Sequence, residues 1–482
     1  MSTEHNQLKK NALSTWDVIS QSLAFLGPVM SMAFLTAYIA LSAGAATPLA
    51  VAIGGLTMIA LGYVISQFAS RVHAAGAIYN YAAKALGPEA GFIGGWVYMF
   101  AVLMLTIAVI AGVSGWLTEF LMMIGVLAAP SQFLWVGVVL VVCVSLFLLT
   151  YYDIRISTRT QLWLVLVTVS VVVLLAITIF IKGGAAGHSL VPFSFAAAGG
   201  MEGLAFGLIF SILMYTGFES AAVLAEETED PKRTMPIAII GTVVAAVVLY
   251  TFVTYTFSIG FGVADVSAWA DPNAPAMFTM SAIYWSEGVV PFIFLAAIID
   301  GFAVALGCLT TVTRVAFAMA RDGVLPSMLS RTHPTYKTPY IATGVILALA
   351  FITAIDFAVL YPPAEGALPA YMTQFGFLSG IGAITIEAIY VFVGVAAIIW
   401  FRREMGSEYS IFKHLLVPIF AIAGAGAALY GSLLPQADPL LQKMPYFAFG
   451  WIALGVIYIL VLRSSKPGLV AKIGRELSEM DS

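Results

Sequence analysis

The chain has 482 residues, of which 61% are hydrophobic and only 10% are charged. Soluble domains carry about 25% charged residues, so this composition excludes an ordinary soluble fold. The formal net charge is -4 and the basic residues are scattered, which gives nucleic acid no basic patch to bind. The two cysteines, Cys143 and Cys308, lie in apolar segments and suggest no disulfide. Apolar segments recur almost to residue 464, so the first is expected to be a membrane span and not a cleaved leader.

Membrane-spanning segments follow one another along most of the chain. A helix that crosses about 30 Å of hydrocarbon needs about 20 mainly apolar residues. Twelve such segments occur, and they predict an all-α membrane protein with twelve transmembrane helices. The predicted spans are 17–43, 46–70, 91–127, 131–150, 160–182, 202–227, 234–263, 289–321, 339–360, 372–402, 413–435 and 445–464.

The distribution of basic residues predicts the orientation of these spans. Loops on the cytoplasmic side of a membrane protein are enriched in Lys and Arg. If the N-terminus is cytoplasmic, only Lys182 and Lys443 of the 21 Lys and Arg residues fall on the outer side. The sequence therefore predicts an inner-membrane protein with cytoplasmic tails at 1–16 and 465–482. Residues 71–90 are too polar to span and are expected to form a short helix at the inner face.

The first span is interrupted by Gly27-Pro28. Because Pro28 has no backbone N–H, a continuous helix is disfavoured there, and proline also suits the first turn of a new helix. The amides of Val29, Met30 and Ser31 would then be free to attract an anion. The alternative is an ordinary proline kink, which membrane helices tolerate.

The sixth span contains a second interruption, where Gly217 lies among Tyr215, Thr216 and Phe218 and is followed by the ionisable Glu219. Paired interruptions in two halves of a membrane protein are typical of a transporter whose binding site lies near the bilayer midplane. The pair therefore favours a binding site over two unrelated kinks.

Three stretches resemble the amino acid, polyamine and organocation (APC) permeases, in the order found in that superfamily. They are AAGAIYNYAAKALGPEAGFIGGW (74–96), GFESAAVLAEETEDPKRTMPIAI (217–239) and TRVAFAMARDGVLPSMLSRTHPTYKTP (313–339). The likeness extends over about the first 400 residues. The resemblance implies a LeuT-type fold of five plus five inverted helices, with spans 1 and 6 discontinuous.

The resemblance also implies a domain division and a binding mode. The transport core would comprise 17–402, in two repeats at 17–182 and 202–402, and the helices in 403–464 would be peripheral. The backbone from Gly27 to Ser31 would hold a substrate carboxylate, and the backbone around Tyr215, Thr216, Gly217 and Phe218 its amine. Alternating access would come from rocking of the bundle that contains spans 1 and 6.

Two departures from the family pattern bear on the substrate. Many members have Gly-x-Gly in span 1, whereas this chain has Gly27-Pro28, which resembles the putrescine-importer-like branch. Thr168 aligns with a lysine found in span 5 of some members. Both the putrescine-importer-like and the amino acid permease branches therefore stay open.

Three carboxyl groups lie deep in predicted spans, where a charge costs about 2.5–3.5 kcal/mol. Glu219 matches the family's acidic position and is expected to act in coupling or gating, or to bond freed amides. Asp300 is expected to meet a cationic amine from the outer vestibule, or to be structural. Glu387 would pair with an amine or a proton, or form a polar contact between helices.

Three alternatives for ion coupling stay open. Thr310 and Thr311 of span 8, with the carbonyl of Gly27, form a candidate sodium site, because oxygen ligands suit hard cations. The threonines could instead bond carbonyls of their own helix. Sodium coupling, proton coupling and plain exchange therefore remain, and no cofactor is expected.

The sequence as a whole predicts a secondary transporter for a small amino acid or related amine that works by alternating access. A polyamine importer is the alternative, and a receptor or sensor without transport is a further one. An enzyme is not expected, because the five histidines are scattered and no HExxH, phosphate loop or GxSxG occurs. The expected partners are the small solute and the lipid bilayer, and the oligomeric state is left open.

Overall fold

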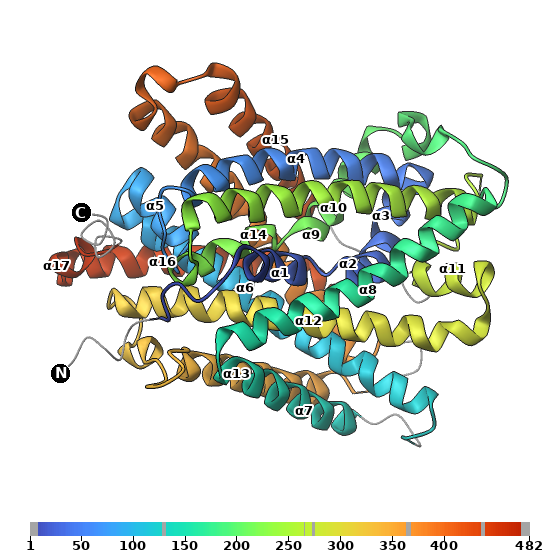
Figure 1. The fold of residues 1–482 in the computed structure, drawn as a ribbon, viewed down its shortest axis with the longest axis horizontal. Helices are drawn as coiled ribbons and strands as arrows, with labels where there is room; N and C mark the ends of the chain where they lie inside the picture. The colour runs from blue at the N-terminus through green and yellow to red at the C-terminus, as the bar shows by residue number, and fades with distance from the viewer. Residues whose placement is uncertain are drawn as a thin grey trace.

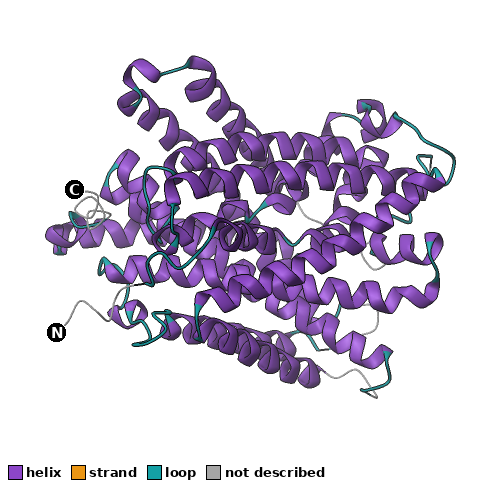
Figure 2. Cartoon of the chain, in the orientation of Figure 1, coloured by secondary structure: helices purple, strands orange, loops and turns teal. Residues whose placement is uncertain are grey.

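A computed structural model describes residues 8–127, 132–264, 266–271, 275–362, 368–434 and 439–473. This part of the chain is helical almost throughout (Figure 2), and its extended pairing is limited to an isolated bridge between Leu13 and Thr228. The predicted tails fall partly at 1–7 and 474–482, which lie outside the described residues.

The α-helices follow one another in chain order (Figure 1). They are α1 (Thr15–Leu26), α2 (Pro28–Met30), α3 (Thr36–Ala43), α4 (Thr47–Ala69), α5 (Ile78–Leu86), α6 (Pro88–Met123), α7 (Gln132–Tyr151), α8 (Ile154–Lys182), α9 (Met201–Tyr215), α10 (Pro231–Phe261), α11 (Ala276–Tyr284), α12 (Val290–Arg321), α13 (Tyr340–Leu360), α14 (Ala370–Glu404), α15 (Val417–Ser432), α16 (Met444–Ser465) and α17 (Pro467–Val470). Tighter or wider helical turns join them at η2 (Ser31–Leu35), η3 (Gly44–Ala46), η4 (Val191–Phe193), η5 (Phe195–Ala198), η6 (Phe218–Glu227), η7 (Glu287–Val289), η8 (Ser327–Ser330), η9 (Gly406–Glu408), η10 (Phe412–Leu416) and η11 (Leu441–Lys443).

Eleven helical segments of the described chain are long and apolar enough to cross a membrane. The first, Thr15–Ala69, has 55 residues and contains the first two predicted spans. At 1.5 Å per residue it is about 80 Å long, more than twice the hydrocarbon thickness of about 30 Å. Gly44, with φ 55°, and the turn η3 separate α3 from α4.

The remaining segments correspond one to one to the other predicted spans, with small differences at their ends. The largest difference is at the start of α8, which begins at Ile154 and not at residue 160. The side chain of Asp153 accepts a hydrogen bond from the amide of Arg155 (3.0 Å). This N-cap lets the helix start earlier than its apolar stretch.

Central helices are buried by other helices, whereas outer helices expose apolar side chains. In the most apolar window of α6, 89% of the residues are buried, but the share falls to 22% in Leu441–Ser465. Trp163, Ile181 and Tyr446 are each at least 70% exposed. Helices α7 and α13 lie side by side at one edge of the molecule, and α15 stands at the opposite edge (Figure 1). Such apolar outer surfaces face lipid, so the chain is a multi-pass membrane protein.

The short helix predicted in 71–90 is present as α5, and most of its residues are buried against other helices, whereas Lys84 is exposed. Tyr79 and Tyr81 are fully buried. A Cβ added to Gly95 of α6 would lie 2.6 Å from the ring of Tyr79, so the two helices pack closely. The hydroxyl of Tyr79 donates to Asp322, which follows α12. The sequence could not show this burial, because the partners come from distant helices.

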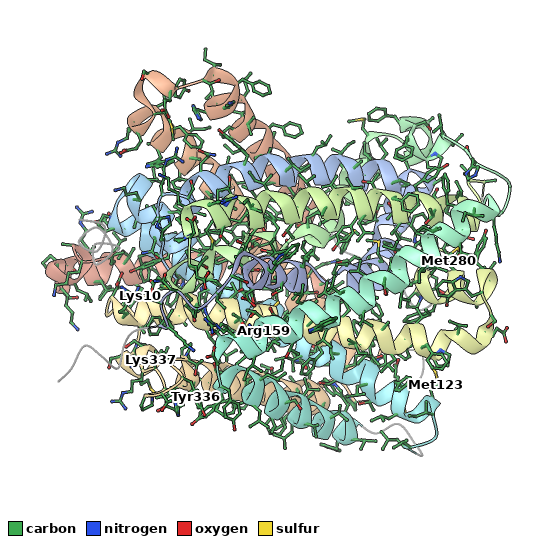
Figure 3. All side chains as sticks on the ribbon, in the orientation of Figure 1. Lys10, Met123, Arg159, Met280, Tyr336 and Lys337 are labelled. Atoms are coloured by element: carbon green, nitrogen blue, oxygen red, sulfur yellow. The ribbon has the colours of Figure 1, made fainter. Side chains whose placement is uncertain are left out.

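Figure 3 shows where some labelled residues lie along the helix bundle. Lys10 and Lys337 lie toward one end, and Met123 and Met280 lie toward the other. Met280 belongs to helix α11, which was not predicted. The nine residues of α11 are too few to cross a membrane.

Candidate functional site

The first transmembrane segment is broken at Gly27. Helix α1 ends at Leu26, and the chain restarts as a helix at Pro28. Gly27 has φ 55°, a conformation that suits glycine. A Cβ at this position would collide with the side chain of Val304 on α12. The carbonyl of Gly27 accepts a hydrogen bond from the amide of Ser31 (2.8 Å), so the restarted helix is well formed.

The second break lies after Tyr215, where α9 ends. Thr216 is extended (φ -60°, ψ 134°), and Gly217 has φ 113°. The chain then continues as a ten-residue 3₁₀ helix, η6, and not as an α-helix. Runs of 3₁₀ helix longer than three or four residues are uncommon, so the irregular backbone extends well beyond the glycine.

The two broken segments contact each other directly. The hydroxyl of Ser22 on α1 donates to the carbonyl of Phe218 (2.7 Å) and accepts from the amide of Ala221 (3.2 Å). The hydroxyl of Ser220 donates to the carbonyl of Gln21 (3.3 Å). The side chain of Ser22 thus satisfies backbone groups of the irregular helix η6, and the side chain of Ser220 satisfies a carbonyl of α1.

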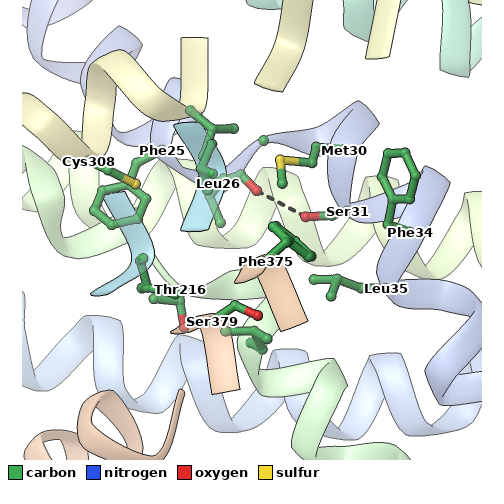
Figure 4. Close-up of a pocket in the computed structure, with 15 residues that line it drawn as sticks. Phe25, Leu26, Met30, Ser31, Phe34, Leu35, Thr216, Cys308, Phe375 and Ser379 are labelled. Atoms are coloured by element: carbon green, nitrogen blue, oxygen red, sulfur yellow. Dashed lines mark hydrogen bonds between the residues drawn. The ribbon is translucent and has the colours of Figure 1, made fainter. Parts of the chain in front are cut away.

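A cavity of about 70 Å³ lies between the breaks (Figure 4). It is lined from α1, α2, η2, α6, α9, α12 and α14. Four of the residues predicted for substrate binding line it, namely Gly27, Met30, Ser31 and Thr216. The other predicted residues, Pro28, Val29, Tyr215, Gly217 and Phe218, belong to the two breaks but are not among the lining residues.

Most of the cavity wall was not found from the sequence. The additional lining residues are Phe25, Leu26, Phe34, Leu35, Leu105, Val109, Leu213, Val304, Cys308, Phe375 and Ser379. They are mainly apolar residues in apolar helices, so no sequence pattern separates them from residues that face lipid. The polar groups at the wall are few, and the hydroxyl of Ser31 donates to the carbonyl of Leu26 (3.1 Å).

Asp300, which the sequence left open as an acid of the outer vestibule or a structural group, is fully buried beside the first break. Its Oδ2 accepts hydrogen bonds from the amides of Val29 and Met30, both at 2.9 Å. Its Oδ1 accepts from the hydroxyl of Thr168 on α8 at 3.0 Å. Two of the three amides predicted to attract an anion, those of Val29 and Met30, thus bind a carboxyl group of the chain itself, and the third, that of Ser31, bonds the carbonyl of Gly27.

Glu219 lies in the second break itself, two residues after Gly217. Its Oε2 accepts from the amide of Gly217 (3.0 Å), and its Oε1 accepts from the hydroxyl of Tyr98 on α6 (3.5 Å). The side chain is 1% exposed. Asp300 therefore bonds two backbone amides at the first break and Glu219 bonds one at the second, and neither carboxyl group lines the cavity.

Glu387 lies apart from the cavity, at the contact of α14 with α15. Its Oε2 accepts from the hydroxyl of Ser432 (2.9 Å). Its Oε1 has no hydrogen-bond partner among the described residues, although the side chain is only 1% exposed. A buried carboxyl oxygen without a partner is costly, so this group is a candidate for holding a proton.

The groups of the predicted sodium site are not brought together. Gly27 lies beside Val304 and Asp300. Thr311 is seven residues further along α12 than Val304, which corresponds to about 10 Å along the helix. The carbonyl of Gly27 accepts the amide of Ser31 in the restarted helix.

Thr311 instead forms a network with Gln21 of α1, a residue that the sequence did not single out. The Gln21 side-chain amide donates to the carbonyl of Gly307 (2.9 Å) and to the hydroxyl of Thr311 (3.2 Å). Thr311 itself donates to the carbonyl of Gly307 (2.9 Å). The hydroxyl of Thr310 has no partner among the described residues.

Known proteins with similar sequences are transporters. The chain is 28% identical over 324 residues to the branched-chain amino acid permease BcaP of Bacillus subtilis, covering 64% of this chain and 67% of that protein. It is 25% identical over 485 residues to the low-affinity putrescine importer PlaP of Escherichia coli, covering 96% of each. It is also 25% identical over 450 residues to the methylthioribose transporter of B. subtilis, covering 90% of this chain and 89% of that protein.

The fold resembles that of a solved transporter. A crystal structure of the Eremococcus coleocola manganese transporter, in complex with an aromatic bis-isothiourea substituted compound, aligns with a TM-score of 0.60. The alignment covers 98% of this chain and 99% of that chain at 12% sequence identity. A family model described as amino acid permease matches residues 13–457. The chain therefore belongs to the amino acid permease family of the APC superfamily, and it is a membrane transporter and not an enzyme.

Proposed function

We propose that this transporter moves a small amino acid or related amine across the cytoplasmic membrane by alternating access, with the cavity between the helix breaks as the binding site. The main support is that both breaks contribute to the wall of one cavity, Gly27 from one side and Thr216 from the other. Irregular backbone at membrane depth is tolerated where it lines a cavity or is buried in protein. A cavity shared by the two facing breaks therefore accounts for the irregular backbone of both helices.

The cavity suits a small solute. One water molecule needs about 10–15 Å³ of the same kind of volume, so 70 Å³ has room for a few waters or a solute of a few heavy atoms. Phe25, Phe34 and Phe375 offer apolar contacts for a short aliphatic chain. Carbonyl groups at the carboxyl ends of α1 and α9 carry negative partial charge and favour an amine.

The proposed topology has twelve crossings, with Thr15–Ala69 counted as two. Both tails would then be cytoplasmic, and Lys182 and Lys443 would be on the outer side. The core 17–402 would consist of two inverted repeats, 17–182 and 202–402, with 403–464 peripheral. Rocking of the segments that contain the two breaks would expose the cavity to each side in turn.

Coupling is proposed to involve the buried carboxyl groups. Glu219 and Asp300 each bond the backbone of one break, so a change in either group would alter the geometry of the cavity wall. Glu387 would act from the contact between α14 and α15. Sodium coupling, proton coupling and exchange make different predictions for uptake into proteoliposomes when potassium replaces sodium at fixed pH and when pH is varied at fixed sodium.

Polyamine import is the second candidate. It is supported by the similarity to the putrescine importer PlaP, which extends over 96% of both chains. It is also supported by the lack of Lys, Arg and His among the residues that line the cavity in the described chain, since such residues would repel a dication. A receptor or sensor would also bind such a ligand but would not transport it.

The test has two stages. The detergent-purified protein is first screened by thermal shift against the common amino acids and against short mono- and diamines. Ligands that stabilise it are then measured for flux into proteoliposomes. Saturable flux of a stabilising ligand supports transport, and stabilisation without flux in either direction favours a receptor. The transport proposal fails if no member of the panel binds or crosses.

A further inference from the structure

The carboxylate of Asp300 is enclosed by three donors from two other parts of the chain. The amides of Val29 and Met30, at the restart of the broken helix, both donate to Oδ2 at 2.9 Å. The hydroxyl of Thr168 on α8 donates to Oδ1 at 3.0 Å. The side chain has no exposed surface. Asp300 is therefore a fixed, hydrogen-bonded acid and not a mobile side chain.

The donors that bind Asp300 are those that an external carboxylate would need. Helical residues continue from Pro28 to Ala43 through α2, η2 and α3, so the amides at the start of this run face an anion with the positive end of the helix. Each amide has one hydrogen, and those of Val29 and Met30 are both used by Asp300. A second carboxylate at this place would lack these donors and would be repelled by Asp300.

The cavity begins directly beside this enclosed acid. Gly27 and Met30 line the cavity, and Val304 on the next turn of α12 after Asp300 lines it as well. A Cβ placed on Gly27 would lie 3.6 Å from Oδ2 of Asp300. The acid thus lies behind a thin part of the cavity wall, where its negative charge favours a cation in the cavity.

We propose that Asp300 determines specificity by taking the place of a substrate carboxylate, so that the cavity accepts a primary amine that has no carboxylate. This inference rests on the proposed transport function and narrows its substrate class. If Asp300 had only a structural role, removing it would weaken the fold without changing which of two matched ligands binds.

The experiment uses ligand pairs that differ only in a carboxylate, isoamylamine with leucine and putrescine with ornithine. Binding to the full-length purified protein is measured by thermal shift and by competition. For the native protein, the amine of at least one pair is expected to bind at a concentration at least about tenfold lower than its amino acid. Asp356→Asn is the control, because Asp356 lies exposed on α13. It should leave the preference unchanged.

Two replacements of Asp300 distinguish the effect of its charge from the effect of a group that fills the site at the amides. Asp300→Asn keeps an acceptor oxygen at the amides but removes the charge, so it should bind the amine at least about tenfold more weakly without gaining leucine. Asp300→Ala vacates the site, so it should weaken amine binding and gain binding of leucine. Acetate in place of chloride should refill the vacated site and raise the melting temperature of Asp300→Ala but not that of the native protein.

A variant that retains the acid covers the case in which Asp300→Ala does not fold. Thr168→Val removes one donor but leaves the carboxylate, so it should retain the amine preference that Asp300→Asn loses. The inference is overturned if the native protein binds or transports the amino acids as well as the amines, or if the Asp300 variants keep the native preference. Those results would leave transport intact, whereas an absence of both binding and flux for all four ligands would overturn transport as well.

Discussion

Gly217 lies against the ring of Phe25, so the two helix breaks meet directly. A Cβ added to Gly217 would lie 2.6 Å from Cγ of that ring, closer than real Cβ contacts allow. The backbone of Gly217 also has φ 113°, which L-residues with a side chain rarely adopt. Close approach and backbone conformation therefore both require glycine at this point.

Gly217→Val is predicted to abolish ligand binding and transport. The new side chain would push Phe25 into the cavity that this ring lines and would strain the backbone by about 1–3 kcal/mol. Membrane insertion should persist, because the hydrophobicity of the span is not reduced. The measurements are thermal shift with a stabilising ligand, uptake into proteoliposomes, and the amount of monodisperse protein recovered from membranes.

Gly241→Ala is the matched control for this change. Gly241 lies inside α10 with nothing within 4 Å of an added Cβ, so alanine should be tolerated and should slightly favour the helix. If Gly217→Val transports like Gly241→Ala, then close packing of the two breaks is not needed for function.

The predictable part of this structure follows from local chemistry. The spans were predicted because lipid requires long apolar helices, and the first break was predicted because Pro28 has no N–H to donate. The second break was predicted only as an interruption at Gly217. The sequence did not indicate the 3₁₀ helix η6, because hydrogen bonds from Ser22, nearly 200 residues away, help to stabilise it.

The partners of the buried acids could not be predicted for the same reason. Asp300 is 271 positions from Val29 and 132 positions from Thr168. Asp300 and Thr168 each stand out in the sequence, Asp300 as an acid deep in a span and Thr168 as a departure at the span 5 lysine position. Nothing in the sequence pairs them, since the pairing depends on how α8 and α12 pack against the first break.

Arg314→Met is predicted to destabilise the protein by about 3–5 kcal/mol, because it would leave the buried carboxylate of Glu227 without its partner. Arg314 Nε lies 2.7 Å from Oε2 of Glu227, and the two side chains are 4% and 2% exposed. The carbonyl of Glu227 also accepts the amides of Ala12 and Leu13, so the N-terminal segment should loosen as well. Melting temperature and limited proteolysis measure the two effects.

Two further variants test the reason for this loss. Arg314→Met combined with Glu227→Gln should be more stable than Arg314→Met alone, because the unpaired charge is gone. Arg463→Met should change stability by less than about 1 kcal/mol, because its ion pair with Glu89 is largely exposed. Equal losses for Arg314→Met and Arg463→Met would contradict a special role of the buried pair.

Because of Asp153, the attachment of the N-terminal segment should weaken at acid pH. Partial burial alone would raise the pKa of Asp153, but hydrogen bonds from Lys9 and from the amide of Arg155 outweigh it and lower the pKa below 3.8. Since the folded pKa is lower than the unfolded one, the stabilisation is present above about pH 4 and is lost as the pH falls through the folded value.

The comparison is between the native protein and Asp153→Asn across pH. The native protein should melt at the higher temperature at pH 7, and the difference should shrink below pH 4. A difference that stays constant down to pH 3 would show that the Asp153 carboxylate is not the group responsible.

Glu387→Gln is predicted to alter transport without altering ligand affinity. Glu387 does not line the cavity, so the concentration of ligand that gives half-maximal thermal stabilisation should change by less than about twofold. Glutamine keeps an acceptor for the hydroxyl of Ser432 but cannot take up or release a proton.

If Glu387 acts in coupling, uptake driven by a pH gradient should fall at least about tenfold in this variant, while exchange of labelled for unlabelled ligand without a gradient should continue. Ser432→Ala is the matched control, because it removes the hydrogen bond to residue 387 but retains the acid. Loss of gradient-driven uptake in both variants would mean that the contact between α14 and α15 matters only for structure, and unchanged uptake in Glu387→Gln would remove this residue from coupling altogether.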